Sequence, residues 1–229
     1  GKDYALKFDD PRIRLTAYGL LAANGHNMQP WKIRLDQADP MVFYLYADRG
    51  RVTKEVDPLA RQMMVTQGAF LEYVSIAGDQ SGYQTDIELF PQGGYNEQKL
   101  EESMDATPVA KITLTKAAPR SAPLYEYMFS PDTNRAPYQP AKLSAEQVHE
   151  LESINADDSL SIKIFQNKED MDKLGNYAIK GAVVEAGVDR VMKESEVIFR
   201  ANEYQKNRYR YGFSIEGQGT SGIMKHLLQ

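Results

Sequence analysis

The chain contains no cysteine. This absence excludes disulfides, thiol nucleophiles and thiolate metal sites, but it assigns no compartment, because disulfide-free proteins occur everywhere. Histidine is scarce as well, and the three that exist, His26, His149 and His226, match no metal-binding spacing such as His-Glu-x-x-His. We therefore expect no metal site.

Positive charge and long apolar runs are also lacking. Lysine and arginine together number 27 against 32 acidic residues, which gives a net charge of −5 and argues against nucleic acid as a partner. The longest clear apolar run, 41–47, is far shorter than the roughly 20 residues that cross a bilayer. The sequence predicts a soluble globular protein without a transmembrane segment.

The N-terminus leaves the compartment open to two interpretations. The chain begins at Gly1 without a methionine, so removal of an export signal is one alternative, and an expression scar is another. Our expectation is a cytoplasmic protein. With 229 residues it can bury a sizeable core, as one large domain or as two closely packed halves.

The most informative segment is 22–31, Ala-Ala-Asn-Gly-His-Asn-Met-Gln-Pro-Trp. Before it, Asp10 and Pro11 are typical of a helix start, and apolar residues continue to Ala23. Asn24 and Gly25 tolerate a left-handed backbone, so we expect them to end this helix at 11–23. A strand at 31–36 is expected to follow.

The polar residues between this helix and this strand suggest a binding loop. Pro30 biases Gln29 towards an extended conformation, and His26, Asn27 and Gln29 carry hydrogen-bonding side chains. Loops held between rigid elements are common places for binding groups. The alternative is an ordinary solvated turn, since asparagine, glycine and proline are common turn residues.

The segment resembles the Pro-Ser-Gly-His-Asn-Thr-Gln-Pro-Trp signature of nitroreductase-like flavoproteins, most closely their Acg-like branch, in which one chain carries two related halves. The positions of His26, Asn27, Gln29, Pro30 and Trp31 match, as does the glycine before them. Three differ, because Ala23, Asn24 and Met28 replace Pro, Ser and Thr.

A second match lies at 57–69. Asp57-Pro58 is expected to start a long helix that ends at Gly78, and its Asp-Pro, Arg61 and Gly68-Ala69 pattern again resembles the Acg-like branch. Gly68 lies inside this helix, where glycine costs roughly 1 kcal/mol relative to alanine. Either a tight helix crossing or the close approach of a flat ligand would compensate.

The remaining pattern predicts a mixture of strands and helices. Further strands are expected at 41–48, 84–90 and 109–116, with a long loop at 91–108 and a boundary at 118–123. In the second half, Ser144 and Gln147 form a capping box for a helix from about 145. A strand at 160–166 and helical sequence over 168–203, capped near Asn167 and divided at Gly175 or Gly187, complete the half.

The second half also carries part of the resemblance. Acg-like chains open this half with Arg-x-Thr-Asn-Arg, which Thr133, Asn134 and Arg135 match, whereas Pro131 replaces the first arginine. Those chains also run further, so the resemblance implies a first half at 1–118 and a shortened second half at 119–229. Both halves are expected to pack as one domain.

The resemblance implies an α+β fold with a central, mainly antiparallel sheet flanked by helices, and FMN at the junction of the halves. The implied cofactor-binding residues are Asn24, Gly25, His26, Asn27, Gln29, Trp31, Thr133, Asn134 and Arg135.

Their chemistry suits a flavin. An arginine fork can bind phosphate with two hydrogen bonds, although an exposed surface charge is an equal alternative for Arg135. The amides of Asn27 and Gln29 suit the alternating carbonyl and N–H edge of the pyrimidine. His26 can donate to phosphate or ribityl oxygens, and Trp31 can cover the ring.

Two other motifs are weaker. Residues 217–222 satisfy Gly-x-Gly-x-x-Gly, but only seven residues follow, too few for a dinucleotide fold, so we expect a flexible loop. Residues 206–211 interleave bases with aromatics as single-strand binders do. The acidic total and the absence of an RNA-binding or oligonucleotide-fold pattern argue against that partner, and the run could equally contact a phosphate or be a solvated strand.

We therefore expect an FMN-dependent oxidoreductase that passes two electrons from NAD(P)H to an electron-poor small molecule. The flavin would carry out the chemistry, so no catalytic side chain is named. The alternatives are a protein that holds flavin without turnover and a degenerate member that acts as an interaction domain. A homodimer and a site completed within one chain both remain open.

Overall fold

The computed structural model describes residues 2–130, 133–154 and 160–220. The chain divides into two compact units. The first comprises 1–134 and 194–229, and the second comprises 135–193. The division into halves at 118 that the resemblance implies stays a prediction.

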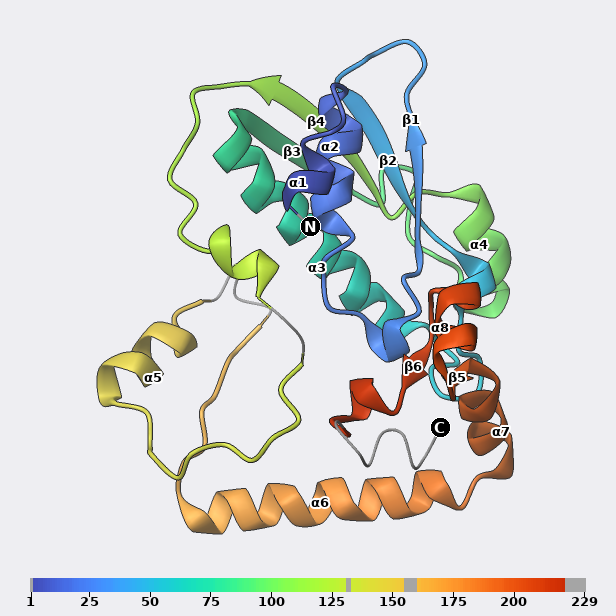
Figure 1. Ribbon diagram of the computed structural model, residues 1–229, viewed down its shortest axis with the longest axis vertical. Helices are drawn as coiled ribbons and strands as arrows, with labels where there is room; N and C mark the ends of the chain where they lie inside the picture. The colour runs from blue at the N-terminus through green and yellow to red at the C-terminus, as the bar shows by residue number, and fades with distance from the viewer. Residues whose placement is uncertain (1, 131–132, 155–159, 221–229) are drawn as a thin grey trace. The chain divides into compact units, whose positions relative to one another are not determined.

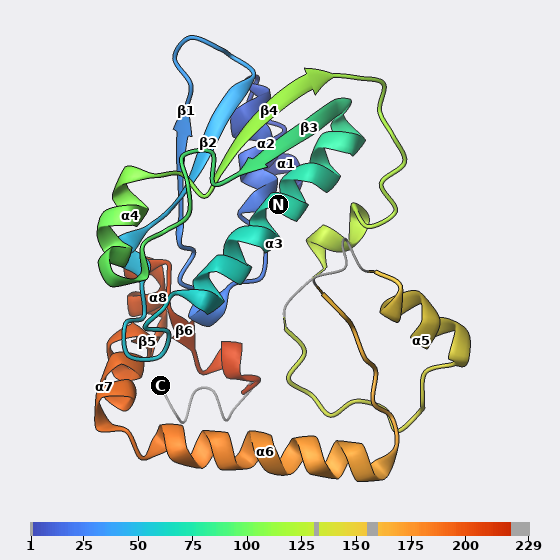
Figure 2. The ribbon, with the colours of Figure 1, turned by 180° about the vertical axis from the view of Figure 1, so that it is seen from behind.

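The first unit is built on a four-stranded antiparallel sheet (Figures 1 and 2). Its spatial order is β1 (Trp31–Leu35), β2 (Val42–Ala47), β4 (Ala110–Lys116) and β3 (Tyr83–Leu89). Helices α1 (Lys2–Ala5), α2 (Pro11–Gly19), α3 (Arg61–Ser81) and α4 (Leu100–Ala106) flank this sheet. The expected α+β class is therefore confirmed, and each of the four predicted strands in this unit is present within one residue of its expected bounds.

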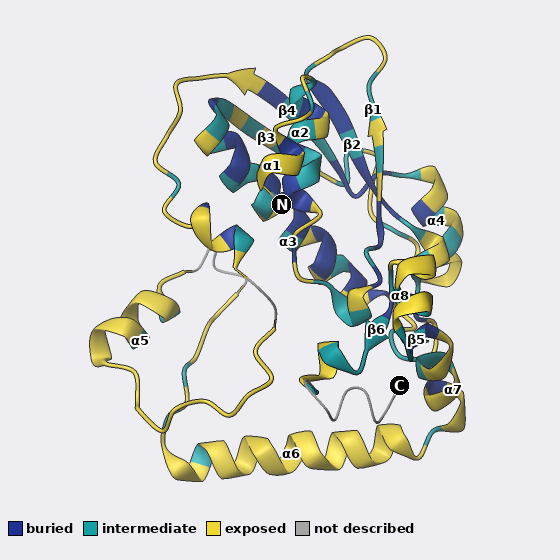
Figure 3. Ribbon diagram, in the orientation of Figure 1, coloured by how far each residue is buried: buried dark blue, intermediate teal, exposed yellow. Residues whose placement is uncertain are grey.

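Alternation along the strands builds the core. Phe43 and Ile112 face each other across β2 and β4 and are fully buried, and Leu45 pairs with Ala110 in the next inward position. Helix α3 adds Phe70, Val74 and other residues to the same hydrophobic cluster. Figure 3 shows this burial concentrated along the sheet and α3.

The ends of α2 and α3 differ from those expected. Asp10 caps α2, as predicted, but the helix ends at Gly19, because residues 20–22 turn back with hydrogen bonds to carbonyls three and four residues earlier. Helix α3 begins at Arg61 rather than at Pro58, and it continues past Gly78 to Ser81. Gly82, with φ +79°, provides the left-handed cap that Gly78 was expected to supply.

The segment 91–108 is not the continuous loop that the sequence predicted. Asn96 caps a short 3-10 turn, and α4 follows at Leu100–Ala106. Met104 in α4 is almost fully buried and Leu100 packs partly buried against the same cluster, so two apolar side chains hold a short helix that periodicity alone did not indicate.

The second unit contains α5 (Ala145–Glu152) and α6 (Lys168–Ala186). The predicted capping box is present: the amide of Gln147 donates to Ser144 Oγ at 3.1 Å, and the amide of Ser144 donates to Gln147 Oε1 at 2.9 Å. Asn167 caps α6 as expected, and Gly187, not Gly175, ends it. Helix α7 (Asp189–Ile198) then leads back to the first unit.

The predicted strand at 160–166 is wrong. In the described part of the chain these residues pair with no strand, and side chains satisfy part of their backbone instead. The amide of Ile164 donates to Glu152 Oε1 at 3.0 Å, for example. A strand requires a partner edge as well as apolar alternation, and the sequence shows only the second. No helix among the described residues is both long and apolar enough to span a bilayer.

Arg12 ties α2 to the β1–β2 hairpin. Its side chain is 10% exposed, and its guanidinium donates through Nη1 to the carbonyls of Asp36, Asp39 and Val42, at 2.9 to 3.2 Å. Its other nitrogens bind Asp10, and this hydrogen bond lowers the pKa of the Asp10 carboxyl. One buried cation therefore joins the helix start to the turn between two strands.

Replacing Arg12 with methionine should lower the free energy of unfolding by about 2–4 kcal/mol, because the hairpin carbonyls lose a buried donor. Urea denaturation measures this change. Lys99→Met is the control, since Lys99 is exposed and pairs only with Glu102 at 3.4 Å among the described contacts, so its replacement should cost less than about 1 kcal/mol. Equal losses in the two variants would contradict this role for Arg12.

Candidate functional site

The loop at 24–30 has an unusual backbone. His26, Asn27 and Gln29 have φ of 51°, 53° and 50°, so three non-glycine residues within four positions are left-handed. The prediction was wrong in two respects: Asn24 is extended, and Gln29 is left-handed instead of extended. Such residues cost about 1–3 kcal/mol each and persist where tertiary contacts hold them, often at binding sites.

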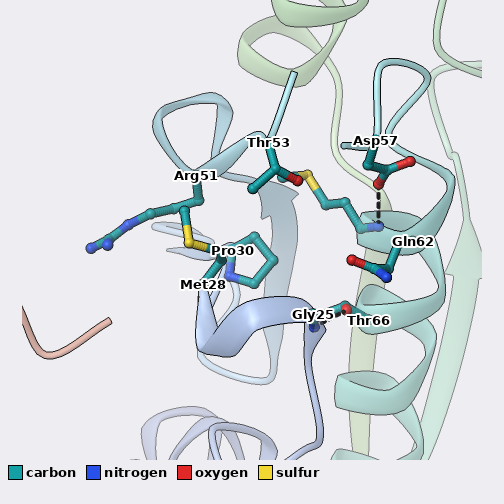
Figure 4. A pocket seen from close by; sticks show the side chains of 9 residues that line it. Gly25, Met28, Pro30, Arg51, Thr53, Asp57, Gln62 and Thr66 are labelled. Atoms are coloured by element: carbon teal, nitrogen blue, oxygen red, sulfur yellow. Dashed lines mark hydrogen bonds between the residues drawn. The ribbon is translucent and has the colours of Figure 1, made fainter. Parts of the chain in front are cut away.

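Helix α3 supplies those contacts (Figure 4). Gln67, fully buried, donates from Nε2 to the carbonyl of Pro30 at 2.8 Å. Thr66 Oγ1 accepts from the amide of Gly25 at 3.4 Å, and a Cβ at Gly25 would overlap the side chain of Gln62. A larger residue at position 25 would therefore require the exposed Gln62 side chain to move.

A small pocket lies between the loop and the start of α3 (Figure 4). Its lining residues are Gly25, Met28, Pro30, Arg51, Thr53, Asp57, Gln62, Met63 and Thr66. The α3 side of the pocket is strained as well, because Ala60 has φ 51°. Asp57 compensates by accepting hydrogen bonds from the amides of Arg61 and Met63 at 2.8 and 3.0 Å. Two strained segments therefore meet at one pocket.

A segment distant in sequence packs on the other side of the loop. We call residues 199–214 the strap; it contains β5 (Phe199–Arg200), α8 (Glu203–Tyr209) and β6 (Phe213–Ser214). The amide of Gly212 donates to the carbonyl of Asn27 at 3.0 Å, and Asn27 Nδ2 donates to the carbonyl of Gly212 at 3.1 Å. Gln29 Nε2 donates to the carbonyl of Arg210 at 2.5 Å.

Aromatic and charged contacts hold the strap in place. The Arg51 guanidinium lies 3.5 Å from the centre of the Tyr211 ring, and Arg200 lies 4.9 Å from the same ring. Phe213 packs against His26 with ring centres 5.7 Å apart. Ahead of the strap, Glu194 Oε2 accepts from the amides of Glu55 and Val56. The sequence run 206–211 therefore belongs partly to a helix and packs on the loop, and it is not a strand.

Ion pairs of Lys206 stabilise α8, one within the strap and one with a residue just beyond it. Lys206 pairs with Glu203 and Glu216, and the hydrogen bonds that its ammonium donates to these carboxylates raise the pKa of the lysine. Residues 216–218 form a short 3-10 turn, while the end of the 217–222 motif lies outside the described residues.

Several buried polar atoms near the loop lack a hydrogen-bond partner within the described ranges. They are His26 Nδ1, Trp31 Nε1, Arg51 Nη1 and Gln67 Oε1. Buried polar atoms are normally paired, so each of these could be satisfied by water or by a ligand. The loop is therefore surrounded by hydrogen-bonding side-chain atoms that have no hydrogen-bond partner in the described ranges.

The nine predicted site residues fall into two groups. Asn24, Gly25, His26, Asn27 and Gln29 share the loop, and Trp31 follows it, 9% exposed and packed 5.4 Å from Phe70 between ring centres. Thr133, Asn134 and Arg135 are exposed, and Arg135 begins the second unit. Their role stays a prediction. Arg51 and Tyr211 were not predicted as site residues, because only tertiary packing brings them to the loop.

Gly68 has no close neighbour among the described residues. It is exposed on α3, and a Cβ added there would meet no atom within 4 Å. The fold therefore does not require glycine at this position. A tight helix crossing is excluded within the described part of the chain, and ligand approach stays open.

Replacing Gly68 with alanine should raise the free energy of unfolding by about 0.5–1 kcal/mol, since helix propensity improves without a clash. Thermal or urea denaturation tests this. The matched variant is Gly78→Ala on the same helix, where the added Cβ would overlap Thr85 Cγ2, so we expect destabilisation. The same sign of change in both variants would contradict the packing described for α3.

Comparison with known proteins gives distant relatives. No family model matches the chain. It is 28% identical over 137 residues to PigM, a probable NAD(P)H nitroreductase of Serratia sp., which covers 57% of this chain and 35% of PigM. It is 25% identical over 124 residues to an uncharacterised protein of Mycobacterium tuberculosis strain H37Rv, covering 48% of this chain and 36% of that protein. The chain spans about a third of the length of these relatives.

Some solved structures that are similar to part of this chain carry nitroreductase or flavin oxidoreductase names. They include a nitroreductase-like protein of Streptococcus mutans, with 13% identity, a TM-score of 0.33, and coverage of 50% of this chain and 82% of that one. A second is a putative NAD(P)H:FMN oxidoreductase of Staphylococcus epidermidis, with 14% identity, a TM-score of 0.32, and coverage of 60% and 92%. TM-scores this low do not establish a shared fold.

Proposed function

We propose that this chain binds FMN and, as a nitroreductase-type oxidoreductase, passes two electrons from NAD(P)H to an electron-poor small molecule. The main support is the loop at 24–30, which carries the resemblance to the flavoprotein signature and holds three strained residues against α3. The distant similarity to a probable NAD(P)H nitroreductase points to the same class.

The residues near the loop fit the chemistry of a flavin. Asn27 and Gln29 present amide groups on one side of the loop, where each already binds a peptide group. Arg51 Nη1 and His26 Nδ1 are buried and without partners in the described chain, as polar groups that await a ligand would be.

Each residue then has a proposed task. Asn27 and Gln29 would bind the pyrimidine edge, and His26 would donate to ribityl or phosphate oxygens. Thr133, Asn134 and Arg135 would hold the phosphate end, an assignment that rests on the resemblance alone. Bound FMN supplies hydride transfer, while these side chains bind and orient it.

The two alternatives keep the same loop but drop the reaction. A protein that holds or sequesters flavin would bind FMN without turnover. A degenerate member would act as an interaction domain and bind no flavin at all. Both alternatives are compatible with this fold and loop, because binding residues can persist when a reaction is lost.

The visible spectrum is the first test. After reconstitution with FMN and removal of free ligand, the protein should retain stoichiometric flavin absorbance. NADH or NADPH should then bleach it, and a nitroarene or quinone should restore it. Retained colour without bleaching would favour the flavin-holding alternative, and a colourless protein would overturn flavin binding.

Arg135 can be tested separately from the loop. Arg135→Ala should weaken FMN binding roughly 10- to 100-fold, the value of a charge-assisted phosphate contact, and should leave riboflavin binding unchanged because riboflavin has no phosphate. Fluorescence titration measures both affinities. Lys142→Ala, at another exposed cation of the same unit, is the control. An equal loss for FMN and riboflavin would contradict the phosphate role.

A further inference from the structure

The strap offers the loop an ordered set of main-chain groups. Gln29 Nε2 donates to the carbonyl of Arg210, and Asn27 Nδ2 donates to the carbonyl of Gly212. The main-chain carbonyl of Asn27 accepts from the N–H of Gly212. The order is acceptor, donor, acceptor. A flavin pyrimidine edge presents the same order, since an N–H lies between two carbonyls.

We propose that the strap occupies the hydrogen-bonding groups of Asn27 and Gln29 in the free protein. A ring with an imide edge must displace the strap in order to bind these groups. This inference rests on the proposed function and adds regulation of the same site. A ring that pairs with Asn27 and Gln29 at the positions of these strap groups cannot bind while the strap occupies them, so the two partners compete.

The docked strap depends on glycine at 212. Gly212 has φ +90°, and a Cβ there would overlap the carbonyl oxygen of Ile198. Any other residue would therefore have to shift the peptide group that Asn27 binds. Gly217 lies three residues beyond the strap. A Cβ added there would make only an ordinary van der Waals contact, with Ser214 Oγ at 3.8 Å.

Tyr211 gives the strap a second anchor. Its ring contacts the guanidinium groups of Arg51 and Arg200, and its carbonyl accepts from Arg200 Nε at 2.8 Å. The Tyr211 side chain makes none of the hydrogen bonds that join Arg210 and Gly212 to the loop in the described structure. Removing the ring should therefore loosen the strap while leaving Asn27 and Gln29 intact.

The competition has a quantitative consequence. Only molecules with a released strap bind the ring, so the apparent dissociation constant equals the intrinsic constant divided by the released fraction. Variants that release the strap should bind more tightly although they gain no contact with the ligand.

The test compares Gly212→Ala with Gly217→Ala in the full chain. Gly212→Ala should bind FMN and lumichrome at least tenfold more tightly than the unaltered protein. Gly217→Ala should bind both ligands with the affinity of the unaltered protein. Lumichrome carries the imide edge without ribityl or phosphate, so a shared gain assigns the effect to that edge. Fluorescence titration gives both affinities.

A second pair guards against misfolding of the glycine variant. Tyr211→Ala should also tighten binding, whereas Tyr204→Ala, at a 69% exposed tyrosine of α8, should not. Hydrogen exchange provides a direct measurement, because FMN should reduce protection of the Gly212 amide in the unaltered protein.

The outcomes separate the two proposals. If FMN binds the unaltered protein and both strap variants equally, and Gly212 keeps its protection, the strap is structural and this inference is overturned while flavin binding stands. If none of the proteins binds FMN or lumichrome, although exchange shows the strap released in Gly212→Ala, the proposed function itself fails.

Discussion

Contact between α3 and the loop at 24–30 is the constraint on which the rest of the site depends. The buried amide of Gln67 holds the carbonyl of Pro30, and Thr66 holds the amide of Gly25. The same helix packs through Phe70 against Trp31, the first residue of β1. The loop is thereby fixed at both ends, and the cost of its left-handed residues is offset by packing that also builds the core.

Arg12 acts in the same way at the opposite end of β1. It joins α2 to the turn between β1 and β2, so helix and hairpin move as one body. The loop between α2 and β1 therefore connects two elements that are already held together. Such a loop can keep a strained shape, because relaxing it would require breaking buried contacts on both sides.

The returning segment 194–214 completes this arrangement from far along the chain. Glu194, Tyr211 and Gly212 attach to residues that are more than 130 positions earlier, through carboxylate, aromatic and main-chain contacts respectively. The polar side of the loop is therefore not simply exposed to solvent. It already makes the kind of hydrogen bonds that a heterocyclic ligand would make, which makes the strap part of any account of binding.

Strand positions, the Asp10 and Asn167 caps and the Ser144–Gln147 capping box were predictable from sequence, because each depends on period-2 alternation or on neighbours within three residues. The strand predicted at 160–166 is absent from the structure, since no partner edge exists for it in the described chain. The end of α2 and the buried anchor of α4 also depended on distant contacts.

The candidate loop shows the same division. Sequence alone selected its polar residues and its resemblance to a flavoprotein signature. It misplaced the left-handed residues, because the contacts that hold the loop come from Thr66 and Gln67 of α3, far along the sequence. Only the tertiary structure decided that Gly212 faces Asn27, since hydrogen bonds between peptide groups leave no trace in side-chain pattern.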